Sequence, residues 1–117
     1  MDYLKNYYAL IHNAQAEVRS GYLELHHIIP RCIFGEEILN EGLLGDVNQE
    51  SNLVYLSPRE HFVAHWLLHR AFPKNKKLGL AFWAMAGMVS PDQERNYTPS
   101  SRAIAEARVA AANARKI

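Results

Sequence analysis

Apolar residues recur at intervals of three or four positions along the start of the chain. The positions that carry this period are Leu4, Tyr7, Tyr8, Ile11 and Val18. Such spacing places side chains on one face of a helix, so we expect a helix over residues 3–18. Ser20-Gly21 is a turn signal and is expected to end it.

Two extended segments follow, separated by a long connection. Alternation from Tyr22 to Ile28 predicts a strand, which Pro30 ends. Leu23, Leu25 and His27 fall on one side of it, and Tyr22, Glu24 and His26 fall on the other. Leu53–Leu56 predicts a second strand, antiparallel to the first. Residues 31–51 connect the two strands, and the sequence leaves the role of this connection open.

The helical period returns downstream. Residues from Pro58 to about Ala71 predict a helix that Pro73 closes, and Leu78 to Val89 predicts an apolar helix covering the core. A last, alanine-rich helix begins at Thr98-Pro99-Ser100-Ser101 and runs toward Arg115. Its low apolar content predicts a helix that lies on a surface, on a partner or on DNA.

The start of the helix at Pro58 carries a candidate metal site. Ser57 fits an N-cap, Pro58 the first helical position and Glu60 the end of a capping box. His61 and His65 then lie four residues apart, on one face and about 6 Å from each other. Two imidazoles at this spacing chelate a single metal ion.

A second pair of histidines stands at the end of the first strand. His26 is expected to be a third metal ligand, which leaves coordination positions open as in catalytic sites. His27 points to the opposite side of the strand, so it is not expected to bind the same ion. It is therefore the candidate general base, because a neutral imidazole takes a proton from water at cellular pH.

The two histidine blocks resemble the HNH endonuclease superfamily, and most closely its small free-standing phage-type homing endonucleases. The residues that carry the resemblance are His-His-Ile-Ile-Pro-Arg at 26–31, Asn-Leu-Val at 52–54 and Arg-Glu-His-Phe-x-x-His at 59–65. The motif covers residues 22–69. The tyrosine-rich start of the chain and Phe-Trp-Ala-Met at 82–85 extend the likeness over most of the sequence.

The resemblance implies an α+β fold with a ββα-metal (His-Me finger) core, made of a two-stranded antiparallel hairpin with flanking helices. It implies a single nuclease domain over residues 1–117, divided into an N-terminal helix at 1–20, the ββα-metal core at 22–71 and C-terminal helices at 76–117. It also implies that Asn52 orients the catalytic His27. The connection at 31–51 is longer than the loop of many relatives.

The implied activity is hydrolysis of DNA phosphodiester bonds by a one-metal mechanism, in a nickase or a homing-type enzyme. Water activated by His27 attacks phosphorus, while the ion polarises the phosphate and stabilises the leaving 3′ oxygen. One ion is expected, because the carboxylate cluster of a two-metal site is missing. Zinc, nickel, manganese and magnesium remain open, and three imidazoles suit magnesium least.

Further residues have two interpretations each. Glu24 either hydrogen-bonds a metal-bound imidazole or is a solvated charge. Arg31 and Arg59 either bind phosphate or form surface salt bridges. His69 follows His65 by one turn and more often serves a structural role.

Composition and charge bear on the cellular compartment of the protein and on DNA as its partner. The net charge is only +1, yet basic residues gather in two segments that are candidates for binding DNA phosphates. They are Lys74, Lys76, Lys77, Arg102, Arg108 and Arg115. Ordinary solvated helix ends are the alternative. A lone cysteine, no signal peptide and no long apolar segment favour the cytoplasm of a bacterium or a phage-infected host, away from membranes.

Two other functions remain open. One is a non-enzymatic HNH-like protein that binds DNA or acts as a regulator or inhibitor; the complete histidine set disfavours it. The other is a structural zinc module, which would need a fourth protein ligand. Double-stranded DNA is the expected partner, and a homodimer is compatible with cutting both strands.

Overall fold

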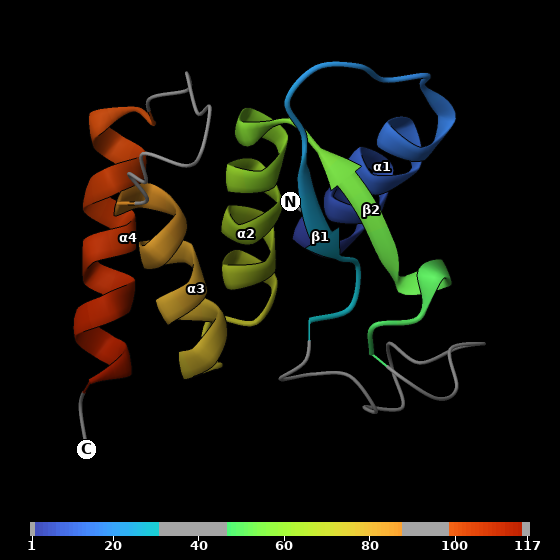
Figure 1. Cartoon of the computed structure of the whole chain (residues 1–117). Helices are drawn as coiled ribbons and strands as arrows, with labels where there is room; N and C mark the ends of the chain where they lie inside the picture. Colours follow the sequence, from blue (N-terminus) through green and yellow to red (C-terminus); the bar gives the residue numbers. More distant parts are fainter. Residues whose placement is uncertain (1, 31–46, 88–98, 116–117) are drawn as a thin grey trace.

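The computed structural model describes residues 2–30, 47–87 and 99–115, and its elements lie side by side in layers (Figure 1). In chain order they are α1 (Tyr3–Ala16), β1 (Glu24–His27), the 3-10 helix η1 (Glu50–Asn52), β2 (Leu53–Leu56), α2 (Pro58–Ala71), α3 (Lys76–Gly87) and α4 (Ser101–Ala114). Over these residues the protein has an α+β fold with one antiparallel hairpin and four α-helices, as predicted. Most of the 31–51 connection lies outside the described residues.

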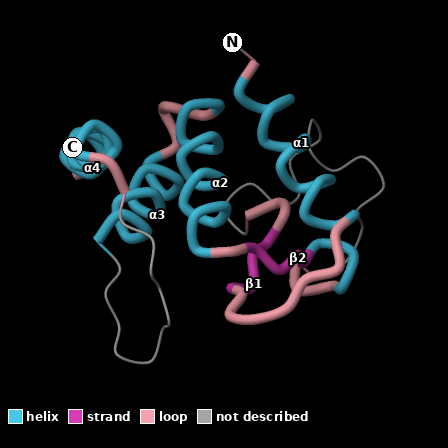
Figure 2. The backbone as a smooth tube through the Cα atoms, turned by 90° about the horizontal axis from the view of Figure 1, so that it is seen from above, coloured by secondary structure: helices cyan, strands magenta, loops and turns pink. Residues whose placement is uncertain are grey.

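α2 stands in the middle of the molecule. The hairpin and α1 lie on one side of it, and α3 followed by α4 lie on the other (Figures 1 and 2). Its start matches the expected signature: Ser57 Oγ accepts from the Glu60 backbone N–H, and Glu60 Oε1 accepts from the Ser57 N–H. Pro58 occupies the first turn. Local sequence therefore fixes where the helix that carries His61 and His65 begins.

The hairpin buries its polar side. Its register pairs Leu25 with Tyr55 and His26 with Val54. Glu24 and His26 face inward, whereas Leu25 is 50% exposed. The alternation of side chains along β1 is as predicted, although the strand is shorter than the predicted Tyr22–Ile28. The buried polar side chains are possible because each finds a hydrogen-bonding partner, as described below.

Two clusters of buried side chains flank α2. One joins α1, the hairpin and α2 through residues such as Tyr7, Ile11, Leu56 and Leu68. The other joins α2, α3 and α4 through Phe62, Phe82, Met85, Ala103, Ala107 and Ala110. Since α2 contributes to both, the position of its histidines depends on packing from two directions.

The last helix buries one face, which its low apolar content did not predict. Its Ala103, Ala107, Ala110 and Ala111 are buried, and they lie at helical spacing on one face. A Cβ atom added at Gly79 of α3 would come within 3.4 Å of the Ala110 carbonyl oxygen, so the two helices approach closely. α4 is thus packed against α3, because its small side chains allow the two helices to approach closely. The low mean hydropathy of the α4 sequence gives no sign of this packing.

Helix ends shift by two residues elsewhere. α1 ends at Ala16 rather than at residue 18, and Glu17 is already extended. α3 begins at Lys76 rather than at Leu78, since Asn75 Oδ1 accepts from the Leu78 N–H and caps it. Val89, the expected end of α3, lies outside the described residues. None of the described helices combines the length and apolarity that crossing a membrane requires.

Candidate metal centre

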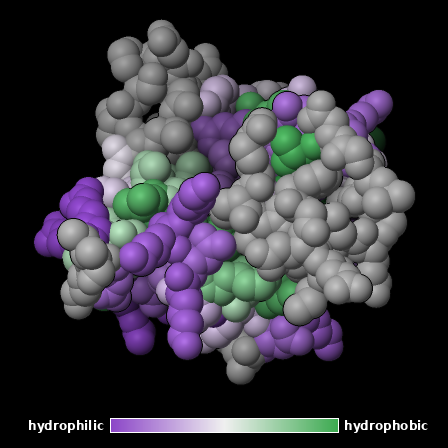
Figure 3. All heavy atoms as spheres, turned by 90° about the horizontal axis from the view of Figure 1, so that it is seen from below, coloured by the Kyte–Doolittle hydropathy of each residue, from purple (hydrophilic) through white to green (hydrophobic). Residues whose placement is uncertain are grey.

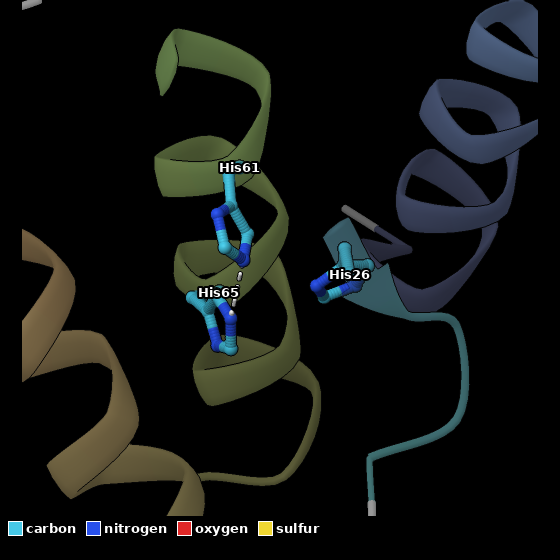
Figure 4. A group of neighbouring side chains, drawn as sticks. All are labelled: His26, His61 and His65. Carbon is cyan, nitrogen blue, oxygen red and sulfur yellow. Dashed lines mark hydrogen bonds between the residues drawn. The ribbon is translucent and has the colours of Figure 1, made fainter. Parts of the chain in front are cut away.

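Three imidazoles from two elements face one another between β1 and α2 (Figure 4). His26 comes from β1, and His61 and His65 come from consecutive turns of α2. One ring nitrogen from each lies within 4.8 Å of the others, and the Nε2 atoms of His61 and His65 are 3.3 Å apart. Two nitrogens bound to one tetrahedral metal at 2.0–2.1 Å would lie about 3.3 Å apart. The donor set therefore fits a single divalent ion after a small side-chain adjustment.

Glu24 sets the orientation of His61. Its Oε1 lies 2.8 Å from His61 Nδ1, and its Oε2 accepts from the Tyr22 hydroxyl at 2.8 Å. A carboxylate accepts and does not donate, so His61 donates from Nδ1 and presents the lone pair of Nε2 to the cluster. Glu24 is 8% exposed, which excludes the interpretation of a solvated charge.

His26 is 3% exposed, the most deeply buried of the three imidazoles. Burial lowers the pKa of His26 well below its ordinary value, and the neighbouring His65, His61 and His27 lower it further. Its ring is therefore neutral at cellular pH and keeps a lone pair for a metal ion. The Tyr7 hydroxyl lies 2.7 Å from His26 Nε2.

A cavity of about 130 Å³ opens beside the cluster. Its walls are Leu25, His26, His27, Pro30, His61 and His65. His27 thus reaches the same cavity as the three clustered imidazoles, although it projects from the other face of β1. Its Nε2 lies 2.7 Å from Asn48 Oδ1, which leaves Nδ1 as the nitrogen able to accept a proton.

Asn52 is completely buried and ties two segments together. Its Oδ1 accepts from the Ile29 N–H, and its Nδ2 donates to the carbonyl oxygens of Ile29 and Val47. Its side chain therefore secures the backbone just after His27. The hydrogen-bonding partner that the structure gives the His27 ring is Asn48, so any orienting effect of Asn52 on that ring is exerted through the backbone.

Of the two arginines predicted to bind phosphate near the cluster, the structure describes one. Arg59 is exposed in the first turn of α2, two residues before His61, while Arg31 lies outside the described residues. His69 is not part of the cluster; its ring stacks on Phe82 at 5.4 Å between centroids. Its role is therefore in packing α2 against α3.

The other predicted basic residues lie beyond α2. Lys74, Lys76 and Lys77 are exposed around the start of α3, and Arg102, Arg108 and Arg115 are exposed along α4. Hydrophilic side chains gather at the end of the molecule where α3 begins and α4 ends (Figure 3). A separate cavity of about 220 Å³ opens there, with Lys74, Lys76 and Asn113 among its lining residues.

Three residues that position the imidazoles or Glu24 carry no signal of that role in the sequence. From the sequence, Tyr7 is only an apolar position of a predicted helix. Asn48 belongs to the connection between the strands, and Tyr22 belongs to the first predicted strand. Each acts on a histidine or on Glu24 through a side-chain hydrogen bond. For Tyr7 and Asn48 the separations from their histidines are 19 and 21 residues, which no local pattern reports.

Relatives of this chain occur in Enterobacteria phage T4. The chain is 39% identical over 109 residues to the protein named "Probable mobile endonuclease E", an alignment that covers 92% of this chain and 68% of that protein. It is 33% identical over 113 residues to "Probable mobile endonuclease C", an alignment that covers 92% of this chain and 45% of that protein. It is 37% identical over 81 residues to "Probable mobile endonuclease D", which covers 69% of this chain and 27% of that protein. No protein-family model matches the chain. No solved structure matches it significantly. The chain spans most of the first relative but less than half of the other two, and it belongs to the family of phage mobile endonucleases that the first represents.

Proposed function

We propose that this protein is a metal-dependent DNA endonuclease of the HNH type, with β1, β2 and α2 as its ββα-metal core. The observation that carries the proposal is one cavity lined by three clustered imidazoles and a fourth, His27, that belongs to a different face of β1. A structural metal module has no use for the fourth imidazole or for an open cavity. The names of the T4 relatives support an endonuclease.

His26, His61 and His65 would hold one divalent ion, whose chemistry is to polarise the scissile phosphate and to stabilise the leaving oxygen. His27 then takes a proton from the attacking water at Nδ1, while Asn48 holds the opposite side of its ring. The exposed Arg59, two residues before His61, is our candidate for pairing with a neighbouring phosphate. Three imidazole ligands favour zinc, nickel or manganese over magnesium.

The substrate is double-stranded DNA, bound mainly through its phosphates. The exposed Lys74, Lys76 and Lys77 are candidates for that contact, as are the arginines of α4. Cutting both strands of the duplex would take two such sites, as in a homodimer, or two successive events at one site.

Incubation of the protein with supercoiled plasmid tests this function. We expect nicked or linear DNA in the presence of added Zn²⁺, Ni²⁺, Mn²⁺ or Mg²⁺, and intact plasmid in the presence of EDTA. The His12→Ala variant is a matched control, because His12 is an exposed imidazole on α1. DNA binding without cleavage under every metal would instead support the non-enzymatic alternative.

Salt dependence of DNA binding tests the basic residues. Changing Arg102, Arg108 and Arg115 together to Gln should reduce the slope of log affinity against log salt by up to about 0.9 for each phosphate that the variant no longer neutralises. The corresponding change of Lys74, Lys76 and Lys77 provides the comparison. An unchanged slope in both variants would remove these segments from the DNA interface.

A further inference from the structure

Tyr7 connects the N-terminal helix to the imidazole cluster. Its hydroxyl oxygen lies 2.7 Å from His26 Nε2 and 2.5 Å from the carbonyl oxygen of Ile28. The side chain is 1% exposed, and its ring packs edge-on against the His26 ring at 6.0 Å between centroids. Tyr7 therefore holds both the ring of His26 and the backbone two residues beyond it.

The direction of each hydrogen bond follows from counting protons. A tyrosine hydroxyl has one proton, and a carbonyl oxygen can only accept. The short contact to Ile28 therefore uses the Tyr7 proton, and the hydroxyl oxygen accepts from His26. His26 then carries its proton on Nε2, and the lone pair of its ring is on Nδ1.

We propose that Tyr7 is a positioning residue for the metal: it holds His26 as the Nε2–H tautomer with Nδ1 available for coordination. Glu24 has the complementary effect on His61, where it accepts the hydrogen bond from Nδ1–H and leaves Nε2 available. The two ligands are thus oriented by partners on different elements and through different ring nitrogens. The proposal rests on the metal centre proposed above but requires no cleavage of DNA.

The Tyr7 hydrogen bond holds the ring of His26 in the orientation and tautomer for coordination before a metal ion binds. A buried imidazole that lacks this partner would leave its Nε2 proton unsatisfied, and its ring would turn or exchange tautomer to recover a hydrogen bond. Metal binding would then have to reverse that change. Loss of the partner of a ligating histidine typically weakens metal binding 10–100-fold, so we expect the dissociation constant of the Tyr7→Phe variant to rise by about that factor.

The first experiment needs no variant of Tyr7. Long-range ¹H–¹⁵N correlation spectra of the metal-free protein at neutral pH report the tautomer of each histidine, and His26 is assigned by comparison with His26→Gln. We expect His26 as the Nε2–H tautomer, with an Nε2 proton protected from exchange. Finding His26 as the Nδ1–H tautomer would overturn the proposal.

The second experiment separates positioning from simple structural support. Co²⁺ is titrated by its visible absorption into the wild type, Tyr7→Phe and the matched control Tyr8→Phe, which loses a hydroxyl from the next residue of α1. The proposal predicts weaker Co²⁺ binding and loss of the protected His26 proton in Tyr7→Phe alone. A Tyr7→Phe protein that melts earlier but binds Co²⁺ as tightly as the wild type would assign Tyr7 a structural role and overturn the proposal. If cleavage of plasmid fails while these results hold, the proposed activity is wrong and the positioning role stands.

Discussion

The interiors on the two sides of α2 differ in polarity. On the side of α1 and the hairpin, which we call the site half, the interior includes Glu24, His26 and Asn52, the polar residues buried among those described. On the side of α3 and α4, the packing half, the interior consists of Phe62, Phe82, Met85 and alanines. The packing half has its polar contacts at the edge, where Arg70 and Trp66 bind Glu106.

This difference separates two kinds of constraint. A buried polar group stabilises the protein only if its partner is in place, so the site half depends on individual hydrogen bonds. An apolar interface depends on volume and tolerates exchange of similar side chains. We therefore expect substitutions in the site half to alter metal binding and catalysis, and substitutions in the packing half to alter stability alone.

The largest effect should come from His27→Ala. Loss of a general base, the role proposed for His27, typically lowers the rate 10²–10⁴-fold. His27 is not among the three clustered imidazoles, so metal affinity should remain unchanged. Plasmid cleavage and calorimetric metal titration measure the two quantities separately. Loss of metal binding in this variant would mean that His26 and His27 have exchanged roles.

His61→Ala and His65→Ala should come next. Each removes one of the three proposed ligands, so metal affinity should fall by more than the 10–100-fold typical of an outer partner. Metal bound only by the native state raises stability by about 2.7 kcal/mol at a hundredfold excess over its dissociation constant. A chelator should therefore lower the Tm of the wild type and of His12→Ala, and should have little effect on the ligand variants. The same Tm for the wild type with and without metal would contradict this coupling.

The packing half is tested by Ala107→Leu. Ala107 is completely buried between α4 and its neighbours, and added methylenes in a filled interior cost about 1–3 kcal/mol. Ala105→Leu is the matched control, since Ala105 is exposed on the same helix and should change stability by less than about 0.5 kcal/mol. Urea unfolding gives both values. A weakened metal affinity in folded Ala107→Leu would show that the two halves are coupled.

The smallest effect is expected where the capping box of α2 meets Arg19, in the segment that follows α1. Arg19 binds the Glu60 carboxylate, and this hydrogen bond is the main reason that the pKa of Glu60 falls from 4.5 to about 2. Because the folded-state pKa is the lower one, the stabilisation is present above about pH 4.5 and is lost as the pH falls toward 2. Glu60→Gln should thus lose about 1 kcal/mol or less at neutral pH, with the difference from wild type vanishing in acid.

Glu17→Gln serves as the control for that pair. Glu17 binds the same Arg19 at 3.1 Å, but its side chain is 64% exposed, so its removal should change stability very little. Urea unfolding at several pH values between 2 and 7 compares the two variants. Equal losses from both would mean that burial of Glu60 contributes nothing to the pair.

Several features were predictable because they are encoded locally. The capping box at Ser57 and Glu60 fixes the start of α2, and the four-residue interval then places His61 and His65 on one face. Alternation along β1 likewise puts His26 and His27 on opposite sides. These signals act over four residues or fewer, where backbone geometry alone decides which side chains are neighbours.

Tertiary structure decided which side of each element is buried. Alternation in β1 could not tell that Glu24 and His26 would face inward and Leu25 outward, because that choice depends on Tyr7, Tyr22 and His61 as partners. The low hydropathy of α4 could not reveal its close packing on α3, which depends on Gly79 lying opposite Ala110. The sequence by itself thus determined the histidine spacing and the helix start. The fold alone brought His26 to the α2 pair and Tyr7 to His26, since these contacts join segments whose approach is set by packing around α2.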